Sequence, residues 1–234
     1  MELIQMDVMD MSELSKRSEG KIYSLAISIS NVEERVTEMY NTVTDTSWLK
    51  PLDIIDELTY SSRSKPTIDK VVNEILNNVQ SELSEEFGEY MVSDTALSAL
   101  KEYLRHLRLP LAELIKEKIS GNPGFDFHSE ASEAVITFGE AKYSGVSNAH
   151  GRALRQINEF ILAKKDIQEL SDLRRFVSEA AIQNASKGIK SYCAAFSIVS
   201  DNPLKIMRNA LDSVHLKYLL QFEAIFLIGV KVNA

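Results

Sequence analysis

The segment that most restricts how this chain can fold runs from Ala134 to Tyr143 and reads Ala-Val-Ile-Thr-Phe-Gly-Glu-Ala-Lys-Tyr. β-branched and aromatic residues in such a run favour a buried strand, so the fold must contain a sheet that receives it. Side chains alternate along a strand, so Glu140 and Lys142 point to the same face. Unpaired charges are disfavoured in a core, so this pair must line a cleft or form a mutual ion pair.

Other segments are expected to pack around that strand. Helices are predicted where apolar residues recur with helical spacing, and strands where short apolar runs lie between turn residues. The predicted helices span Thr67 to Leu83 after a polar connector at residues 61–66, Asp94 onward with a break at Pro110, 152–165 and 167–185. The predicted strands are 22–30, 125–128, 134–143, 191–199 and 225–232.

This order of elements predicts the fold class. Helix, hairpin, helix and strand in succession indicate an α/β (α+β) fold in which a mixed central sheet is flanked by helices, rather than a bundle or a sandwich. At 234 residues the chain is long enough for one substantial core. We place a mixed N-terminal region at residues 1–66, packed on the core, and the main domain at residues 67–234.

Composition indicates the compartment. The chain is 44% hydrophobic and 26% charged, which is ordinary for a folded globular protein. Cys193 is the only cysteine, so this chain forms no internal disulfide and no cysteine-rich zinc site, which favours a reducing compartment. The first residues lack the pattern of a signal peptide, and no apolar stretch approaches membrane-spanning length. We therefore expect a cytoplasmic protein without a membrane role.

The charge balance bears on nucleic-acid binding. The formal net charge is −8, whereas nonspecific DNA affinity comes mostly from Lys and Arg that neutralise phosphates. A protein of this charge that acts on DNA must either concentrate its basic residues locally or rely on a partner that holds the DNA.

The short strand at 125–128 and the strand at 134–143 are expected to form a β-hairpin. Asp126, in the first of these strands, is the third candidate site residue. An odd number of loop residues would put Asp126 on the face of Glu140, whereas an even number without a bulge would turn it away, and the sequence leaves both open. Carboxylates at Asp126 and Glu140 would bind Mg²⁺, or Mn²⁺, which polarises a phosphodiester and lowers the pKa of an attacking water. Lys142 would orient that water or stabilise the developing negative charge.

Each of these residues also has a purely structural interpretation. Glu140 and Lys142 could form an ion pair on an exposed strand face, which contributes little energy. Asp126 could be a turn residue after Pro-Gly. The neighbouring ionisable residues whose spacing gives no reason to include them in the site are Glu113, His128 and His150.

These motifs resemble a known class of nuclease. Pro123-Gly124-Phe125-Asp126, followed after thirteen residues by Glu140-Ala141-Lys142, is similar to the PD-(D/E)xK motif. The longer runs at 124–128 and 138–143 resemble the HamA family, the nuclease subunits of Hachiman anti-phage defence systems, most strongly over residues 85–165. Because Gly124 and Phe125 separate Pro123 from Asp126, the proline–acid part departs from the family pattern. We carry over Asp126, Glu140 and Lys142 only.

The resemblance implies a restriction-endonuclease-like fold and a site that contains one more residue. A glutamine on the helix after the catalytic strand approaches the active site in many such nucleases, which points to Gln156. It shares a helix face with Arg152, Arg155 and Glu159. This face either contacts phosphate through Arg152 or Arg155 or is simply exposed to solvent. The resemblance also implies a hetero-oligomer with a superfamily-2 helicase (HamB), which releases or activates the nuclease when infection produces damaged or unusual DNA.

Three functions follow as hypotheses. The leading one is a Mg²⁺-dependent DNA endonuclease that serves as the effector of an anti-phage complex. The second is a noncatalytic subunit that regulates a DNA-translocating partner and keeps the Glu-x-Lys strand as a structural relic. The third is a self-sufficient restriction endonuclease, which should dimerise and display a basic base-reading surface, and the sequence shows no obvious basic cluster for that role.

Overall fold

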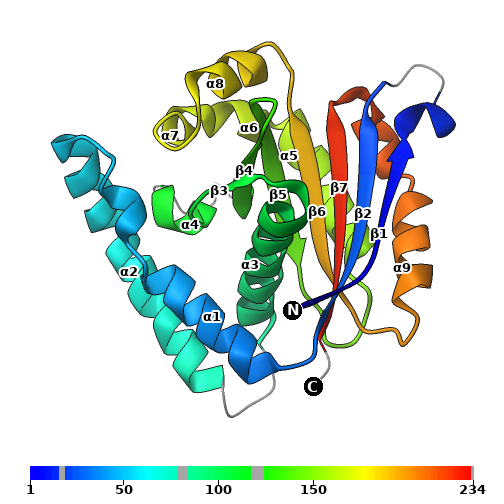
Figure 1. Cartoon of the computed structure of the whole chain (residues 1–234), viewed down its shortest axis with the longest axis horizontal. Helices are drawn as coiled ribbons and strands as arrows, with labels where there is room; N and C mark the ends of the chain where they lie inside the picture. Colours follow the sequence, from blue (N-terminus) through cyan, green and yellow to red (C-terminus); the bar gives the residue numbers. More distant parts are fainter. Residues whose placement is uncertain (16–18, 79–83, 117–123, 233–234) are drawn as a thin grey trace.

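The computed structural model describes residues 1–15, 19–78, 84–116 and 124–232, and it shows a curved sheet with helices on both faces (Figure 1). The sheet has seven strands in the order β1-β2-β7-β6-β5-β4-β3. The predicted mixed α/β architecture is therefore confirmed. Pro123 and the last residues of the helix predicted over 67–83, namely residues 79–83, lie outside the described residues.

The centre of the sheet consists of four parallel strands, and their bounds are β2 Lys21–Ile29, β7 Ala224–Val232, β6 Ser191–Ile198 and β5 Val135–Lys142. Every residue of β6 is buried, as expected for a parallel strand that helices cover on both faces. The strands predicted at 22–30, 134–143, 191–199 and 225–232 are all present within a residue or two of their predicted ends.

The N-terminal residues belong to this same sheet. β1 (Glu2–Asp10) pairs antiparallel with β2, and the short 3-10 helix η1 (Met11–Glu13) follows it. β2 in turn pairs with β7 in parallel, from Lys21 beside Ala224 to Ile29 beside Val232. The boundary that we predicted between residues 66 and 67 falls inside a helix, so residues 1–66 contribute an edge strand and a central strand to the common sheet.

Two buried clusters cover the two faces of the sheet. One cluster contains apolar side chains of α1 (Val32–Thr44) and α3 (Glu85–Leu104), which pack on one face. The other contains those of α5 (His150–Leu162), α8 (Glu179–Ser186) and α9 (Pro203–Leu211), together with η3 (Leu216–Gln221). Figure 1 shows α3 in front of the sheet and α5 behind it.

The helix predicted to begin at Thr67 begins much earlier, so the prediction of a polar connector at residues 61–66 was wrong. After η2 (Ser47–Leu49), Asp53 accepts hydrogen bonds from the backbone of Ile55 and Asp56, and α2 runs over Ile54–Asn78 with Pro66 inside it. Its buried stripe is Tyr60, Ser64, Thr67 and Val71. The small hydroxyl residues in that stripe concealed its helical period in the sequence.

The second predicted helix also differs in its bounds. α3 begins at Glu85, whereas the predicted helix begins at Asp94. Ser84 caps the helix, because its Oγ accepts a hydrogen bond from the backbone of Phe87 at 3.2 Å. α3 ends at Leu104, and its C-cap residue Arg105 adopts φ 60°. Leu107, predicted to be helical, lies instead in the two-residue strand β3 (Leu107–Arg108), and α4 (Ala112–Ile115) follows.

The long helix predicted at 167–185 is three short ones, namely α6 (Lys165–Gln168), α7 (Leu170–Leu173) and α8. Ser178 separates α7 from α8, because its hydroxyl caps α8 while its backbone donates to the buried carboxylate of Glu130 at 2.9 Å. The tertiary contact thus overrides the local helical pattern.

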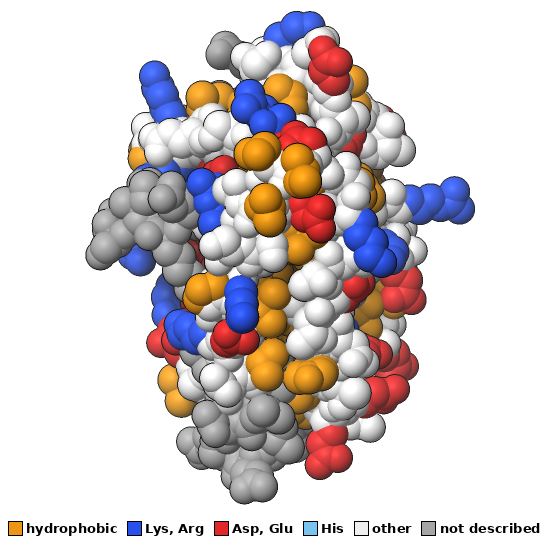
Figure 2. Space-filling view, turned by 90° about the vertical axis from the view of Figure 1, so that its left-hand side faces the viewer, with side chains coloured by type: hydrophobic (Ala, Val, Ile, Leu, Met, Phe, Trp, Pro, Cys, Tyr) orange, Lys and Arg blue, Asp and Glu red, His pale blue; other side chains and the backbone are white. Residues whose placement is uncertain are grey.

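The side of the molecule that carries α1 and α2 displays hydrophobic side chains in small separate patches between charged ones (Figure 2). The exposed apolar residues at the start of α2 are Ile54, Ile55 and Leu58, each more than 60% exposed. Among the described residues, no helix combines the length and the apolar character needed to cross a bilayer.

Candidate active site at the end of the central hairpin

The predicted hairpin is present and sets the position of Asp126. β4 (Phe127–Ala131) pairs antiparallel with β5, with Phe127 opposite Gly139 and Ala131 opposite Val135. The connection has an odd number of residues, and Ala134 in it adopts φ 57°. Extending this register by one residue puts Asp126 beside Glu140, which is the favourable one of the two arrangements that the sequence left open.

Direct contacts join the three predicted residues. Asp126 Oδ2 accepts a hydrogen bond from the backbone nitrogen of Ala141 at 2.8 Å. Ala141 is the residue between Glu140 and Lys142, so this bond holds the Asp126 carboxylate next to both. Lys142 Nζ lies 2.8 Å from Glu140 Oε1. The structure therefore brings Asp126, Glu140 and Lys142 together around the C-terminal end of β5.

Glu140 is the most unusual side chain of the group, because it is completely buried and yet poorly satisfied. Its Oε1 lies close to the Lys142 ammonium without the alignment of a hydrogen bond, and its Oε2 has no hydrogen-bond partner among the described residues. Buried polar atoms in native proteins are nearly always paired. Nothing in the described residues thus satisfies Oε2 of this buried carboxylate.

The ionisation of the site reflects this crowding. Burial raises the pKa of Asp126 to about 6, although the nearby Lys142 opposes the shift. Burial, and then the charge of Asp126, raises the pKa of Glu140 well above its usual range. Burial alone would lower the pKa of Lys142, but Glu140 and Asp126 reverse this and raise it. The site thus holds an ammonium group and two carboxyl groups that repel each other unless a cation compensates them.

Glu89 is a further acidic residue of this site, and the sequence did not reveal it. It lies on α3, and its Oε1 is 3.3 Å from Lys142 Nζ. Asp126 and Glu89 also line a pocket of about 40 Å³ together with Glu86, Glu113 and Tyr90, whose hydroxyl donates to Glu113. The helical pattern in the sequence begins only at Asp94, so it does not indicate that the charged first turns of α3 lie beside the hairpin.

Gln156 does not join this cluster through any hydrogen bond to Asp126, Glu140 or Lys142, and its side chain is half-buried on α5. Arg152 on the same helix donates to the backbone oxygen of Tyr143 at 2.6 Å and to Glu85 at 2.8 Å. It thereby ties α5 to the end of β5 and to α3. Arg155 forms a solvent-exposed ion pair with Glu159 at 3.6 Å.

A second buried cluster holds the segment that precedes Asp126. Glu169 accepts hydrogen bonds from the backbone of Phe125 at 3.0 Å and from the ammonium of Lys116 at 2.6 Å, and it pairs with His128 at 2.7 Å. A Cβ on Gly124 would come within 2.1 Å of Glu169 Oε1, so a larger residue there would displace the carboxylate that holds the segment. His128 is thus engaged by Glu169, a residue from a distant part of the chain.

The fit of a divalent cation depends on the donor set. Carboxylate oxygens are the ligands that Mg²⁺ prefers, and Glu140 presents one oxygen without a partner. In the part of the chain that the structure describes, no group of three or more His, Cys, Asp or Glu side chains is arranged to hold a metal ion. Asp126 and Glu140 are the two carboxylates of the site that could hold such an ion, with water molecules completing the coordination, as is usual for Mg²⁺.

Comparison with known proteins adds nothing to this geometry. No protein-family model matches the chain, and neither a curated protein nor a solved structure matches it.

Proposed function

We propose that the chain is a Mg²⁺-dependent endodeoxyribonuclease of the PD-(D/E)xK type, with Asp126, Glu140 and Lys142 as its catalytic residues. The observation that carries this proposal is the buried Glu140 carboxylate, which lies beside Lys142 and has an oxygen without a partner among the described residues. A purely structural ion pair would satisfy that oxygen or expose it to water. The mixed central sheet flanked by helices agrees with the fold that the sequence resemblance implies.

Asp126 and Glu140 would hold Mg²⁺, with Mn²⁺ as the alternative ion. When bound, the ion would supply Lewis-acid polarisation of the phosphodiester and a lowered pKa for the attacking water. Relief of the repulsion between the two carboxyl groups favours binding, because both have raised pKa values in the metal-free protein.

Lys142 would act on the reacting atoms directly. Glu140 and Asp126 keep its ammonium group charged, so Lys142 can orient the attacking water or stabilise negative charge on the phosphorane oxygens. The attacking water gives up a proton to solvent as it adds to phosphorus, the bond from phosphorus to the leaving ribose oxygen breaks, and that oxygen takes up a proton from solvent. Glu89, at 3.3 Å from Lys142, positions the ammonium group from α3.

The biological setting belongs to the same proposal and rests on the resemblance to the HamA family. We propose that the chain is the effector of an anti-phage complex in the cytoplasm and that a helicase subunit activates it. Its net charge of −8 supports a division of labour in which the partner provides most of the grip on DNA.

The decisive experiment is a plasmid cleavage assay with Mg²⁺, with and without the helicase partner and ATP. We expect Glu140→Gln, Asp126→Asn and Lys142→Met each to lower the cleavage rate by about 100-fold or more. Glu159→Gln, an exposed change on α5, serves as the matched control and should cleave like the wild type. Wild-type cleavage rates in both Glu140→Gln and Lys142→Met would refute the proposal.

A noncatalytic regulatory subunit is the second candidate, and the exposed apolar start of α2 favours it. Ile54, Ile55 and Leu58 present adjacent apolar side chains to solvent, as protein-binding surfaces often do. This alternative predicts that Ile55→Asp alters the activity of the helicase partner, whereas Glu140→Gln has no effect on any activity of the complex. A loss of cleavage in Glu140→Gln would exclude it.

A further inference from the structure

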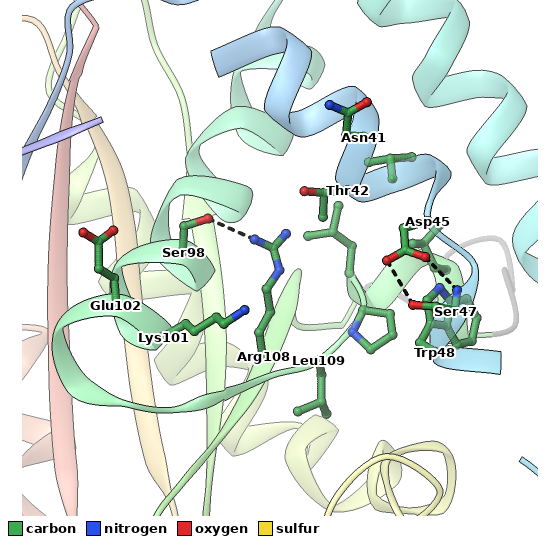
Figure 3. A pocket seen from close by; sticks show the side chains of 14 residues that line it. Asn41, Thr42, Asp45, Ser47, Trp48, Ser98, Lys101, Glu102, Arg108 and Leu109 are labelled. Atoms are coloured by element: carbon green, nitrogen blue, oxygen red, sulfur yellow. Dashed lines mark hydrogen bonds between the residues drawn. The ribbon is translucent and has the colours of Figure 1, made fainter. Parts of the chain in front are cut away.

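A pocket lies away from the candidate catalytic residues, where α1, α3 and the β3–α4 connection meet (Figure 3). It has a volume of about 720 Å³, which is within the range of small-molecule sites in proteins. Figure 3 shows Lys101 and Arg108 on one side, Asn41 and Thr42 on the opposite side, and Trp48 at one end. The chemistry of these side chains indicates what the pocket accepts.

Arg108 is held rigidly at the wall of the pocket. Its guanidinium donates to Ser98 Oγ at 2.9 Å and pairs with Asp94, a fully buried carboxylate that also pairs with Arg35. Arg35 has a second acidic partner in Glu38, so Asp94 and Ser98 together anchor the Arg108 guanidinium at the pocket wall. Arginine has five N–H donors, so donors remain for a ligand. The Arg108 side chain is 18% exposed.

Lys101 adds a second positive charge on the same wall. It lies one turn of α3 beyond Ser98, is exposed, and pairs with no acidic side chain in the residues that the structure describes. Figure 3 shows its side chain extending toward Arg108, whereas the neighbouring Glu102 points away. The other acid of the pocket, Asp45, is engaged by the backbone and hydroxyl of Ser47 at 2.8 and 3.0 Å.

The rest of the pocket is suited to a flat, partly apolar group. Trp48 is half-buried, and its ring is fixed by an edge-to-face contact with Phe176 at 5.8 Å between centroids. Leu109 and Pro110 provide apolar surface, and Asn41 provides amide donors and acceptors. Aromatic rings stack on nucleobases without much regard to sequence, while Arg and Lys bind phosphate.

We infer that this pocket binds a nucleotide, with the phosphate on Arg108 and Lys101 and the base against Trp48. The choice of ligand rests on the proposed nuclease function, because a strand that lies at the catalytic residues must continue along a neighbouring surface. Leu111 lines both this pocket and the one beside Asp126. Along α3, Glu89 and Lys101 are separated by about 18 Å at the helical rise per residue, a distance that a few nucleotides span.

The test uses Trp48, the only tryptophan of the chain, as a reporter at the pocket. The full-length protein is titrated in EDTA, without metal and therefore without cleavage, with a single-stranded oligothymidylate, with thymidine monophosphate and with inorganic phosphate. Trp48 fluorescence is recorded, and the anisotropy of a labelled oligothymidylate measures affinity independently. Lys101→Glu is compared with Lys217→Glu, an exposed lysine outside the pocket that undergoes the same change in charge.

The expected result is saturable quenching of Trp48 by the oligonucleotide, weakened about tenfold or more in Lys101→Glu and unchanged in Lys217→Glu. Quenching by the oligonucleotide alone identifies a strand as the ligand, whereas equal quenching by the mononucleotide identifies a free nucleotide. Equal affinity of the wild type and Lys101→Glu for both ligands, or no binding of either, overturns the inference. Because no metal is present, a failed cleavage assay leaves this result standing, and the reverse also holds.

Discussion

Lys142 holds its ammonium nitrogen 2.8 Å from Oε1 of Glu140, a carboxylate that is completely buried and whose second oxygen has no hydrogen-bond partner among the described residues. The two residues stand on one face of β5 because a strand repeats every two residues. An ion pair at the end of a buried strand has desolvation costs that its Coulomb energy seldom exceeds. This arrangement is therefore expected where function rather than stability retains the charges.

Substitution of Glu140 should consequently leave stability unharmed. Glu140→Gln removes a desolvated charge that repels Asp126, while Lys142 keeps Glu89 as a partner at 3.3 Å, and we expect the free energy of unfolding to stay the same or to rise by about 1 kcal/mol. Urea unfolding of the metal-free protein measures this. Glu130→Gln is the matched control, because Glu130 is also buried but accepts a hydrogen bond from Ser178 at 2.9 Å, and it should lose about 1 kcal/mol or more. A loss in Glu140→Gln as large as that in Glu130→Gln would contradict the prediction.

The stability of the metal-free protein should depend on pH through Asp126. Its pKa rises from 3.8 in the unfolded chain to about 6 in the folded protein, chiefly because of burial. The folded state binds the proton more tightly, so the contribution of Asp126 to stability is fully present below pH 3.8 and is lost as pH rises through about 6. Asp126→Asn should flatten this part of the profile of urea midpoint against pH, whereas Glu159→Gln should leave it unchanged. An identical slope in wild type and Asp126→Asn would argue against a raised pKa.

Two glycines should respond to alanine in opposite directions. A Cβ on Gly139 would lie 2.1 Å from the buried ring of Phe127 across the hairpin, so Gly139→Ala should destabilise by about 1–3 kcal/mol. Gly151 lies in α5 with no atom near its Cβ position, and Gly151→Ala should stabilise by roughly 0.5 kcal/mol. Thermal unfolding of both variants checks the pair. Equal effects of the two substitutions would show that the β4–β5 register is not the one described.

Removal of the Glu169 carboxylate should loosen the segment that precedes Asp126. Although burial alone would raise the pKa of Glu169, His128 and Lys116 lower it, so the group is an ionised acceptor for three partners. Glu169→Ala should cost about 3 kcal/mol, and hydrogen exchange at Phe125 should accelerate. Glu179→Ala, on the exposed start of α8, is the control. Unchanged exchange at Phe125 would show that this carboxylate does not hold the segment.

The strands were accessible from sequence because each carries its own signal. The runs that became β2, β5, β6 and β7 are apolar on both faces, and parallel strands covered on both sides require that. The pairing of Glu140 with Lys142 follows from the same period of two. What no local pattern contains is the order of strands, in which β7 lies between β2 and β6.

The errors in the helices have a common physical origin in tertiary contacts. Ser64 and Thr67 are buried in α2, so the sequence there looked like a connector. The sequence did not indicate Glu89 as a site residue, because α3 is buried on most sides and shows little amphipathic contrast. Its role depends on the approach of α3 to the end of β5, which only the three-dimensional structure reveals.

The central place of β7 also constrains how the protein is made. β7 follows every other strand in chain order, yet it alone bridges the pair β1–β2 to the group β6-β5-β4-β3. On a ribosome the two halves of the sheet must therefore wait, each with an open edge, until this segment has emerged. Completion of the sheet, and with it the support behind Glu140, is delayed until β7 has been made.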